Sequence, residues 1–120
     1  MNSFTSIIIP VGKNEKKFHY IKTIEALIET AQEPIEILFL ADGWNPNIRL
    51  LNKYSQVKVV PSKKNLGERQ TVNRGAKIAK GDYILKIDAH CDMSKDWDIK
   101  LKKACSNKTL LVCTLDALDR

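Results

Sequence analysis

Apolar runs and segments of helical periodicity alternate along the whole chain. Short apolar or β-branched runs predict strands at 6–11, 36–41, 57–60, 83–87 and 110–115. Helical spacing and helix-start or helix-stop residues predict helices at about 21–31, 45–54, 68–80 and 96–106. This alternation is typical of crossover units that build a mainly parallel sheet flanked by helices, so we predict an α/β fold.

Several positions refine this fold. The run Ser6 to Val11 is continuously apolar after its first residue, which predicts a central strand buried on both faces. We expect Pro61 to close the third strand and Gly81 to end the third helix. Lys86 fits least well, because a lysine is costly to bury in a strand. It either reaches a bound phosphate or marks a strand that is less enclosed.

Length and composition indicate one globular domain over 1–120, since 120 residues can bury a core but not two ordinary ones. Apolar runs are too short to span a bilayer, and the N-terminus has no export signal, so we predict no transmembrane segment. Three cysteines without C-x-x-C spacing indicate neither a disulfide framework nor a zinc knuckle. We therefore expect a cytoplasmic location.

The formal charge of +6 suits an anionic partner, either nucleic acid, an acidic membrane or a diphosphate. The lysines are scattered and few aromatic residues are interleaved with them for base stacking. We therefore expect no nucleic-acid partner.

A carboxylate and an imidazole, Asp88 and His90, follow the fourth predicted strand at its carboxyl end, where open α/β sheets bind ligands. One residue apart, they can converge on one cation, and this ligand pair suits manganese or zinc better than magnesium. The same pattern also fits a turn-forming aspartate beside a packed histidine. Two ligands leave coordination positions open for phosphate oxygens.

Motifs along nearly the whole chain resemble the N-terminal half of family 2 glycosyltransferases of the GT-A fold, a Rossmann-like nucleotide-diphospho-sugar transferase fold. They are the opening strand with Asn14-Glu15, Ala41-Asp42-Gly43, the 65–81 segment with Arg69, and 88–92 with Trp97. The last motif is similar to the Asp-x-His metal motif of polypeptide N-acetylgalactosaminyltransferases. Gly12-Lys13 and Ala41 depart from the usual family residues.

The resemblance implies a glycosyltransferase that binds a nucleotide-diphosphate sugar, a UDP-sugar, through Mn²⁺ or Mg²⁺ and transfers the sugar to an unknown acceptor. It implies that Asp88 and His90 ligate the metal. The residues that it assigns to the donor pocket are Pro10, Val11, Glu15, Asp42, Arg69 and Asp88. It assigns no catalytic residue.

Other interpretations stay open. Pro10 can end a strand, Asp42 can form a turn before Gly43, and Arg69 can be a solvated helix residue. His19, Trp44 and Trp97 are predicted to serve packing, although Trp44 could cover a donor.

Only 28 residues follow Asp92, so the chain looks truncated against the resemblance. The alternative is a non-catalytic nucleotide-binding or assembly module that retains the donor pocket. A sugar-phosphate nucleotidyltransferase is disfavoured because 11–15 contains a single glycine. We also expect an exposed sheet edge to allow pairing into a homo-oligomer.

Overall fold

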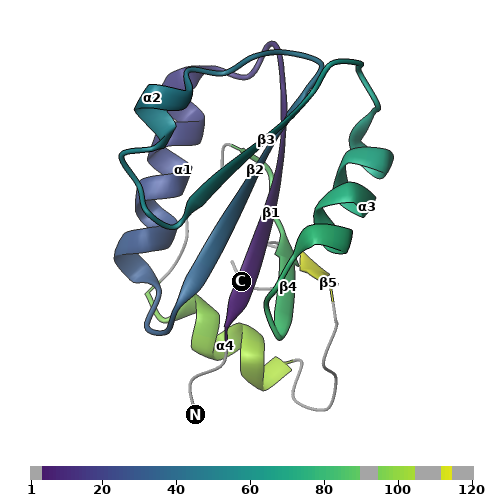
Figure 1. The fold of residues 1–120 in the computed structure, drawn as a ribbon. Coiled ribbons are helices and arrows are strands. Elements are labelled where there is room, and N and C mark those ends of the chain that lie inside the picture. The colour runs from purple at the N-terminus through teal and green to yellow at the C-terminus, as the bar shows by residue number, and fades with distance from the viewer. Residues whose placement is uncertain (1–3, 90–94, 105–111, 115–120) are drawn as a thin grey trace.

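A computed structural model of the chain describes residues 4–89, 95–104 and 112–114. Within these residues, five parallel strands form one sheet in the order β3-β2-β1-β4-β5. The strands are β1 Thr5–Gly12, β2 Ile35–Asp42, β3 Val57–Ser62, β4 Tyr83–Lys86 and β5 Val112–Thr114. The predicted α/β class with a mainly parallel sheet is confirmed (Figure 1).

Helices cover both faces of the sheet (Figure 1). They are α1 Lys17–Thr30, α2 Ile48–Leu51, α3 Glu68–Ile78 and α4 Trp97–Ala104. The larger core cluster unites one sheet face with apolar residues of α1, α2 and α4, and the smaller one joins the other face to α3. The sheet is thus the middle layer of three.

The prediction of a central first strand is confirmed. Ile7, Ile9 and Val11 face the α1 side, Ile8 faces α3, and all four are fully buried. Strand β1 is central because its side chains are apolar on both faces, and each face can therefore be covered by a helix.

Glycine lets α3 approach the sheet closely, as its small residues predict. A Cβ atom on Gly75 would lie 2.7 Å from Cδ1 of Leu40 and 2.9 Å from Cγ2 of Ile8. Such contacts are too short, so a larger residue at this position would force the buried Leu40 and Ile8 side chains to shift.

Three predicted element boundaries were wrong. Pro61 lies inside β3, which continues to Ser62, because β3 is an edge strand among the described residues and tolerates a missing N–H donor. Helix α2 stops at Leu51 rather than near Tyr54, and 52–54 form turns. Helix α3 ends at Ile78, before the predicted stop at Gly81.

A buried carboxylate ties the amino ends of three strands together. Glu36 is 3% exposed and accepts hydrogen bonds from the hydroxyl of Ser6 and from the N–H of Lys80 at 2.8 Å. The ammonium of Lys58 lies 3.0 Å from the other carboxylate oxygen of Glu36. Burial alone raises the pKa of Glu36, but these hydrogen bonds and the lysine charge outweigh it, so the pKa is lowered.

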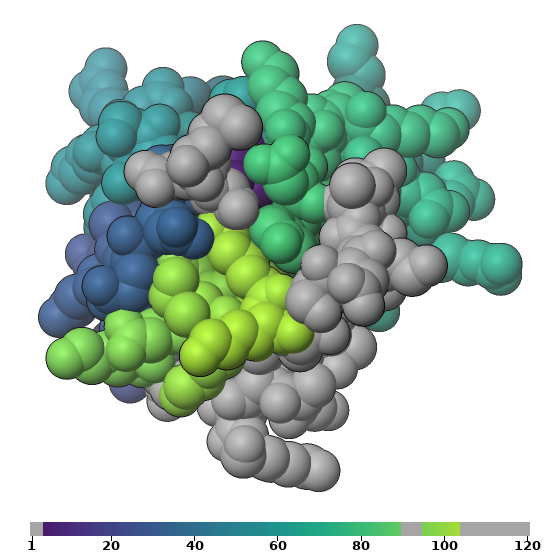
Figure 2. All heavy atoms as spheres, turned by 90° about the horizontal axis from the view of Figure 1, so that it is seen from below, coloured from purple at the N-terminus to yellow at the C-terminus, as the bar shows by residue number. Residues whose placement is uncertain are grey.

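A second buried carboxylate joins α4 to the segment between α1 and β2. Asp98 is fully buried and accepts from the N–H groups of Gln32 at 2.9 Å and Glu33 at 2.8 Å. Figure 2 shows α4 lying against the blue atoms of the segment around the end of α1. Both buried carboxylates lie away from the carboxyl edge of the sheet, which leaves that edge to the candidate site.

Candidate functional site

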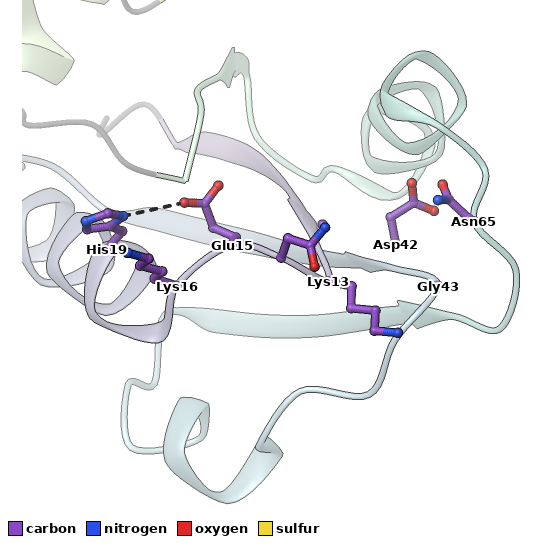
Figure 3. Close-up of a pocket in the computed structure, with 9 residues that line it drawn as sticks. Lys13, Glu15, Lys16, His19, Asp42, Gly43 and Asn65 are labelled. Carbon is purple, nitrogen blue, oxygen red and sulfur yellow. Dashed lines mark ion pairs between the residues drawn. The ribbon is translucent and has the colours of Figure 1, made fainter.

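A pocket of about 610 Å³ opens at the carboxyl edge of the sheet. It is bounded by the loop after β1, the turn after β2 and the loop that leads from β3 to α3 (Figure 3). The nine residues that line it are Gly12, Lys13, Asn14, Glu15, Lys16, His19, Asp42, Gly43 and Asn65.

The strand order explains the position of this pocket. From β1 the chain moves to β2 and then β3 on one side, and it then crosses through α3 to β4 on the other side of β1. Loops therefore diverge at the carboxyl ends of β1 and β4, where open α/β sheets bind ligands. The pocket begins on the β1 side of this point and extends toward the ends of β2 and β3, and no residue after β4 lines it.

The lining is polar and mixed in charge. Lys13 and Lys16 supply cations, and Nδ1 of His19 lies 3.8 Å from Oε2 of Glu15 across one turn at the start of α1 (Figure 3). Asn65 lies beside Asp42 at the other end of the pocket (Figure 3). Such a surface can neutralise an anion and bond to neutral polar groups of the same ligand.

Asp42 lines the pocket, and its carboxylate also shapes the neighbouring loop. It accepts from the N–H of Leu66 at 2.6 Å and of Gly67 at 3.0 Å. Gly67 has φ of +83°, and Gly43, next to Asp42, has φ of +79°. The carboxylate therefore holds the loop that leads into α3, which is a structural role, although it differs from the predicted alternative of a turn before Gly43.

Pro10 and Val11 do not line the pocket. Pro10 is half-buried within β1, and the side chain of Val11 is in the core. The carbonyl of Val11 accepts a 2.7 Å hydrogen bond from Nε1 of Trp44. The Trp44 ring packs against Phe39 and Tyr20, which agrees with the predicted packing role.

Asp88 follows β4, and its carboxylate is paired with Lys86. Nζ of Lys86 lies 3.1 Å from Oδ1 of Asp88 and 3.4 Å from Oε1 of Glu68 at the start of α3. Burial lowers the pKa of Lys86, but the two carboxylates outweigh it, so the pKa is raised. Lys86 thus turns toward two acids, which answers why a lysine is tolerated in this strand.

Of the other predicted site residues, Asp88 and Arg69 do not line the pocket. Arg69 is exposed in the first turn of α3 and is not a lining residue. His90, the second predicted metal ligand, lies outside the described residues. In the part of the chain that the structure describes, no group of three or more His, Cys, Asp or Glu side chains could hold a metal ion.

Several lining residues were missed by sequence reasoning. Lys16 was counted only as scattered charge, Lys13 was noted only as a departure from the usual family residues, His19 was assigned to surface packing, and Asn65 was used only as part of a motif. The signal available was position, because all four follow the carboxyl ends of predicted strands or open the helix after one.

The fold is that of GT-A glycosyltransferases, as the solved structures similar to it show. A crystal structure of GalNAc-T7 with UDP, GalNAc and Mn²⁺ matches with a TM-score of 0.65 and 25% identity, over 80% of this chain and 19% of that one. The crystal structure of TarS from S. aureus matches in fold with a TM-score of 0.69 and 19% identity, over 85% of this chain and 19% of that one.

Residues 6–116 match the family described as glycosyl transferase family 2. The chain belongs to this family. Human polypeptide N-acetylgalactosaminyltransferase 10 is 27% identical over 125 residues, which cover 96% of this chain and 21% of the relative. The chain thus spans about a fifth of the length of the first curated relatives that it matches. No helix among the described residues is long and apolar enough to span a bilayer.

Proposed function

We propose that this chain binds the nucleotide-sugar donor of a family 2 glycosyltransferase, with a UDP-sugar as the donor and a divalent metal as the cofactor. The observation that carries the proposal is the polar pocket at the carboxyl edge of β1 and β2 in a chain of this family. The whole protein would then transfer the glycosyl group to an acceptor.

The pocket fits the chemistry of a nucleoside diphosphate. Lys13 and Lys16 can offset diphosphate charge, while Asn14 and Asn65 offer amide donors and acceptors to ribose or base. The volume of about 610 Å³ lies within the range of small-molecule sites. The UDP in the GalNAc-T7 structure supports this class of ligand.

The residues at the end of β4 fit a divalent metal. Asp88 offers a half-exposed carboxylate at the strand terminus, and its ion pair with Lys86 supports the proposal that this carboxylate can pair with a cation. We propose that Asp88 and His90 hold Mn²⁺, which GalNAc-T7 contains in its crystal structure. When bound, the metal would offset the charge of the departing diphosphate.

Calorimetry with UDP, with and without Mn²⁺, tests the proposal. We expect metal-dependent binding to the wild type and its loss in Asp88→Ala and His90→Ala. Asp82→Ala is the matched control, because Asp82 is an exposed aspartate just before the other end of β4 and should leave binding unchanged. Equal binding by the wild type and both site variants would exclude the proposed metal site.

A further inference from the structure

Lys86 bridges two carboxylates that come from different elements. Its Nζ atom lies 3.1 Å from Oδ1 of Asp88 and 3.4 Å from Oε1 of Glu68. The lysine side chain is 23% exposed, whereas those of Asp88 and Glu68 are 52% and 63% exposed. The cation is therefore the more enclosed member of the group, and the two acids face solvent.

The position of Lys86 in the strand restricts where its charge can go. Lys86 pairs with Ile8 in the sheet, and its neighbours Leu85 and Ile87 are buried on the opposite face. Because side chains alternate along a strand, Lys86 and Asp88 share the face covered by α3. A largely enclosed ammonium needs a carboxylate partner to offset its loss of water.

We propose that Lys86 is an internal cation that competes with the divalent metal for Asp88, and that Glu68 retains Lys86 when the metal takes Asp88. This inference rests on the proposed metal role of Asp88. Two cations on one carboxylate repel each other, so metal binding to Asp88 is opposed by the ammonium and favours its displacement. Glu68 is already within 3.4 Å, so the flexible lysine can give up Asp88 while keeping an ion pair.

Lys86 and Glu68 would then set metal affinity without touching the metal. Removing the Lys86 charge frees Asp88 and should strengthen metal binding. Removing the Glu68 charge leaves Asp88 as the carboxylate partner of Lys86 and should weaken metal binding. Both are positioning residues that act through Asp88.

Mn²⁺ titration of the full chain without nucleotide, followed by the paramagnetic resonance signal of free Mn²⁺, measures this competition. We expect Lys86→Met to bind Mn²⁺ about three- to fivefold more tightly, as one partly exposed ion pair implies, and Glu68→Gln to bind it more weakly by a similar factor. Lys77→Met removes the same charge from an exposed site in the last turn of α3 and should leave the affinity unchanged.

The double variant Glu68→Gln/Lys86→Met shows whether Glu68 acts through Lys86 or through the direct electrostatic attraction of its own charge for the metal. If Glu68 acts through Lys86, Glu68→Gln has no effect on affinity in the Lys86→Met background. Lys86→Gln repeats the test should the methionine variant fail to fold, since circular dichroism reports folding for each protein. Unchanged or weaker Mn²⁺ binding by folded Lys86→Met or Lys86→Gln, relative to Lys77→Met, overturns the inference.

The proposed function fails in a different way. If Asp88→Ala abolishes Mn²⁺ binding but removing the Lys86 charge does not strengthen it, only the competition is wrong. If the wild type binds Mn²⁺ as weakly as Asp88→Ala does, the metal role of Asp88 and the competition are both wrong.

Discussion

At the scale of single residues, three aspartates of this chain have different structural roles. Asp42 binds backbone N–H groups of a loop, Asp98 fastens α4, and Asp88 pairs with a lysine at a half-exposed strand end. A carboxylate whose oxygens are occupied by backbone donors is a structural group, whereas one held by a mobile side chain can exchange its partner. The distinction favours Asp88 as the metal ligand.

Substituting Asp42 tests its structural duty. Asp42→Ala leaves the N–H groups of Leu66 and Gly67 without their acceptor, so we expect the free energy of unfolding to fall by about 1–3 kcal/mol. The weaker loop should also lower UDP affinity, because Asn65 lines the pocket. Urea unfolding measures the first effect and calorimetry the second.

The matched control is Asp82→Ala, whose carboxylate accepts only a 3.3 Å bond from the exposed N–H of Phe4 in the described structure. The Asp82→Ala substitution should lower the free energy of unfolding clearly less than Asp42→Ala does. Equal losses for the two variants would contradict the capping role of Asp42.

At the scale of elements, α3 is the crossover that carries the chain from β3 to β4, past β1, and its contact with the sheet depends on small residues. Gly75 lies against Ile8 and Leu40, and Val72, Ala76 and Ala79 pack on the same cluster. The start of α3 also supplies Glu68 to the ion pair with Lys86. Displacing α3 should therefore disturb the carboxyl edge of the sheet as well as the core.

Gly75→Ala tests this packing. The new methyl group would lie 2.7 Å from Leu40, so we expect a loss of about 1–3 kcal/mol in urea unfolding despite the higher helix propensity of alanine. Gly12→Ala is the control, since a Cβ there meets nothing within 4 Å. A Gly75→Ala protein as stable as the wild type would mean that α3 does not approach the sheet this closely.

At the scale of the whole molecule, the pocket and the hydrogen-bonded Glu36 cluster lie at opposite edges of one sheet. The pocket lies at the carboxyl edge, whereas Glu36 joins β1, β2, β3 and the chain after α3 at the amino edge. Because the pKa of Glu36 is lowered by folding, its contribution to stability is present at neutral pH and is lost as pH falls through the folded pKa.

The pH dependence of unfolding tests this contribution of Glu36 to stability. Urea titrations between pH 7 and pH 3 should show a Glu36→Gln variant less stable than the wild type at pH 7, with the gap closing as pH falls below the ordinary carboxyl value of 4.5. Glu29→Gln, an exposed change on α1, should follow the wild type. A gap that does not narrow as the pH falls from 7 to 3 would show that the charge of Glu36 is not what stabilises the fold.

The sequence was sufficient for the fold and for only part of the site. Continuous apolar runs such as Ser6 to Val11 indicate buried parallel strands, and the small residues on one face of α3 indicate close packing against the sheet. The buried strands and the close packing were therefore predictable. Pro61 inside β3 was not, because tolerance of a proline depends on the strand lying at a sheet edge.

The site was harder to predict because pocket residues come from three separate loops. Their positions after predicted strands place Lys13, His19 and Asn65 at one edge of the sheet, but the sequence does not indicate that they face one cavity or that Glu68 reaches Lys86. These contacts arise only when the strand order brings the carboxyl ends together.

A crystal structure of the chain with UDP and Mn²⁺, with the metal located by its anomalous signal, tests the central claim most directly. We predict UDP in the pocket between the 12–16 loop and Asp42, manganese bound by Asp88 and His90, and Nζ of Lys86 turned from Asp88 to Glu68. UDP bound elsewhere, or manganese bound away from Asp88, would contradict the account.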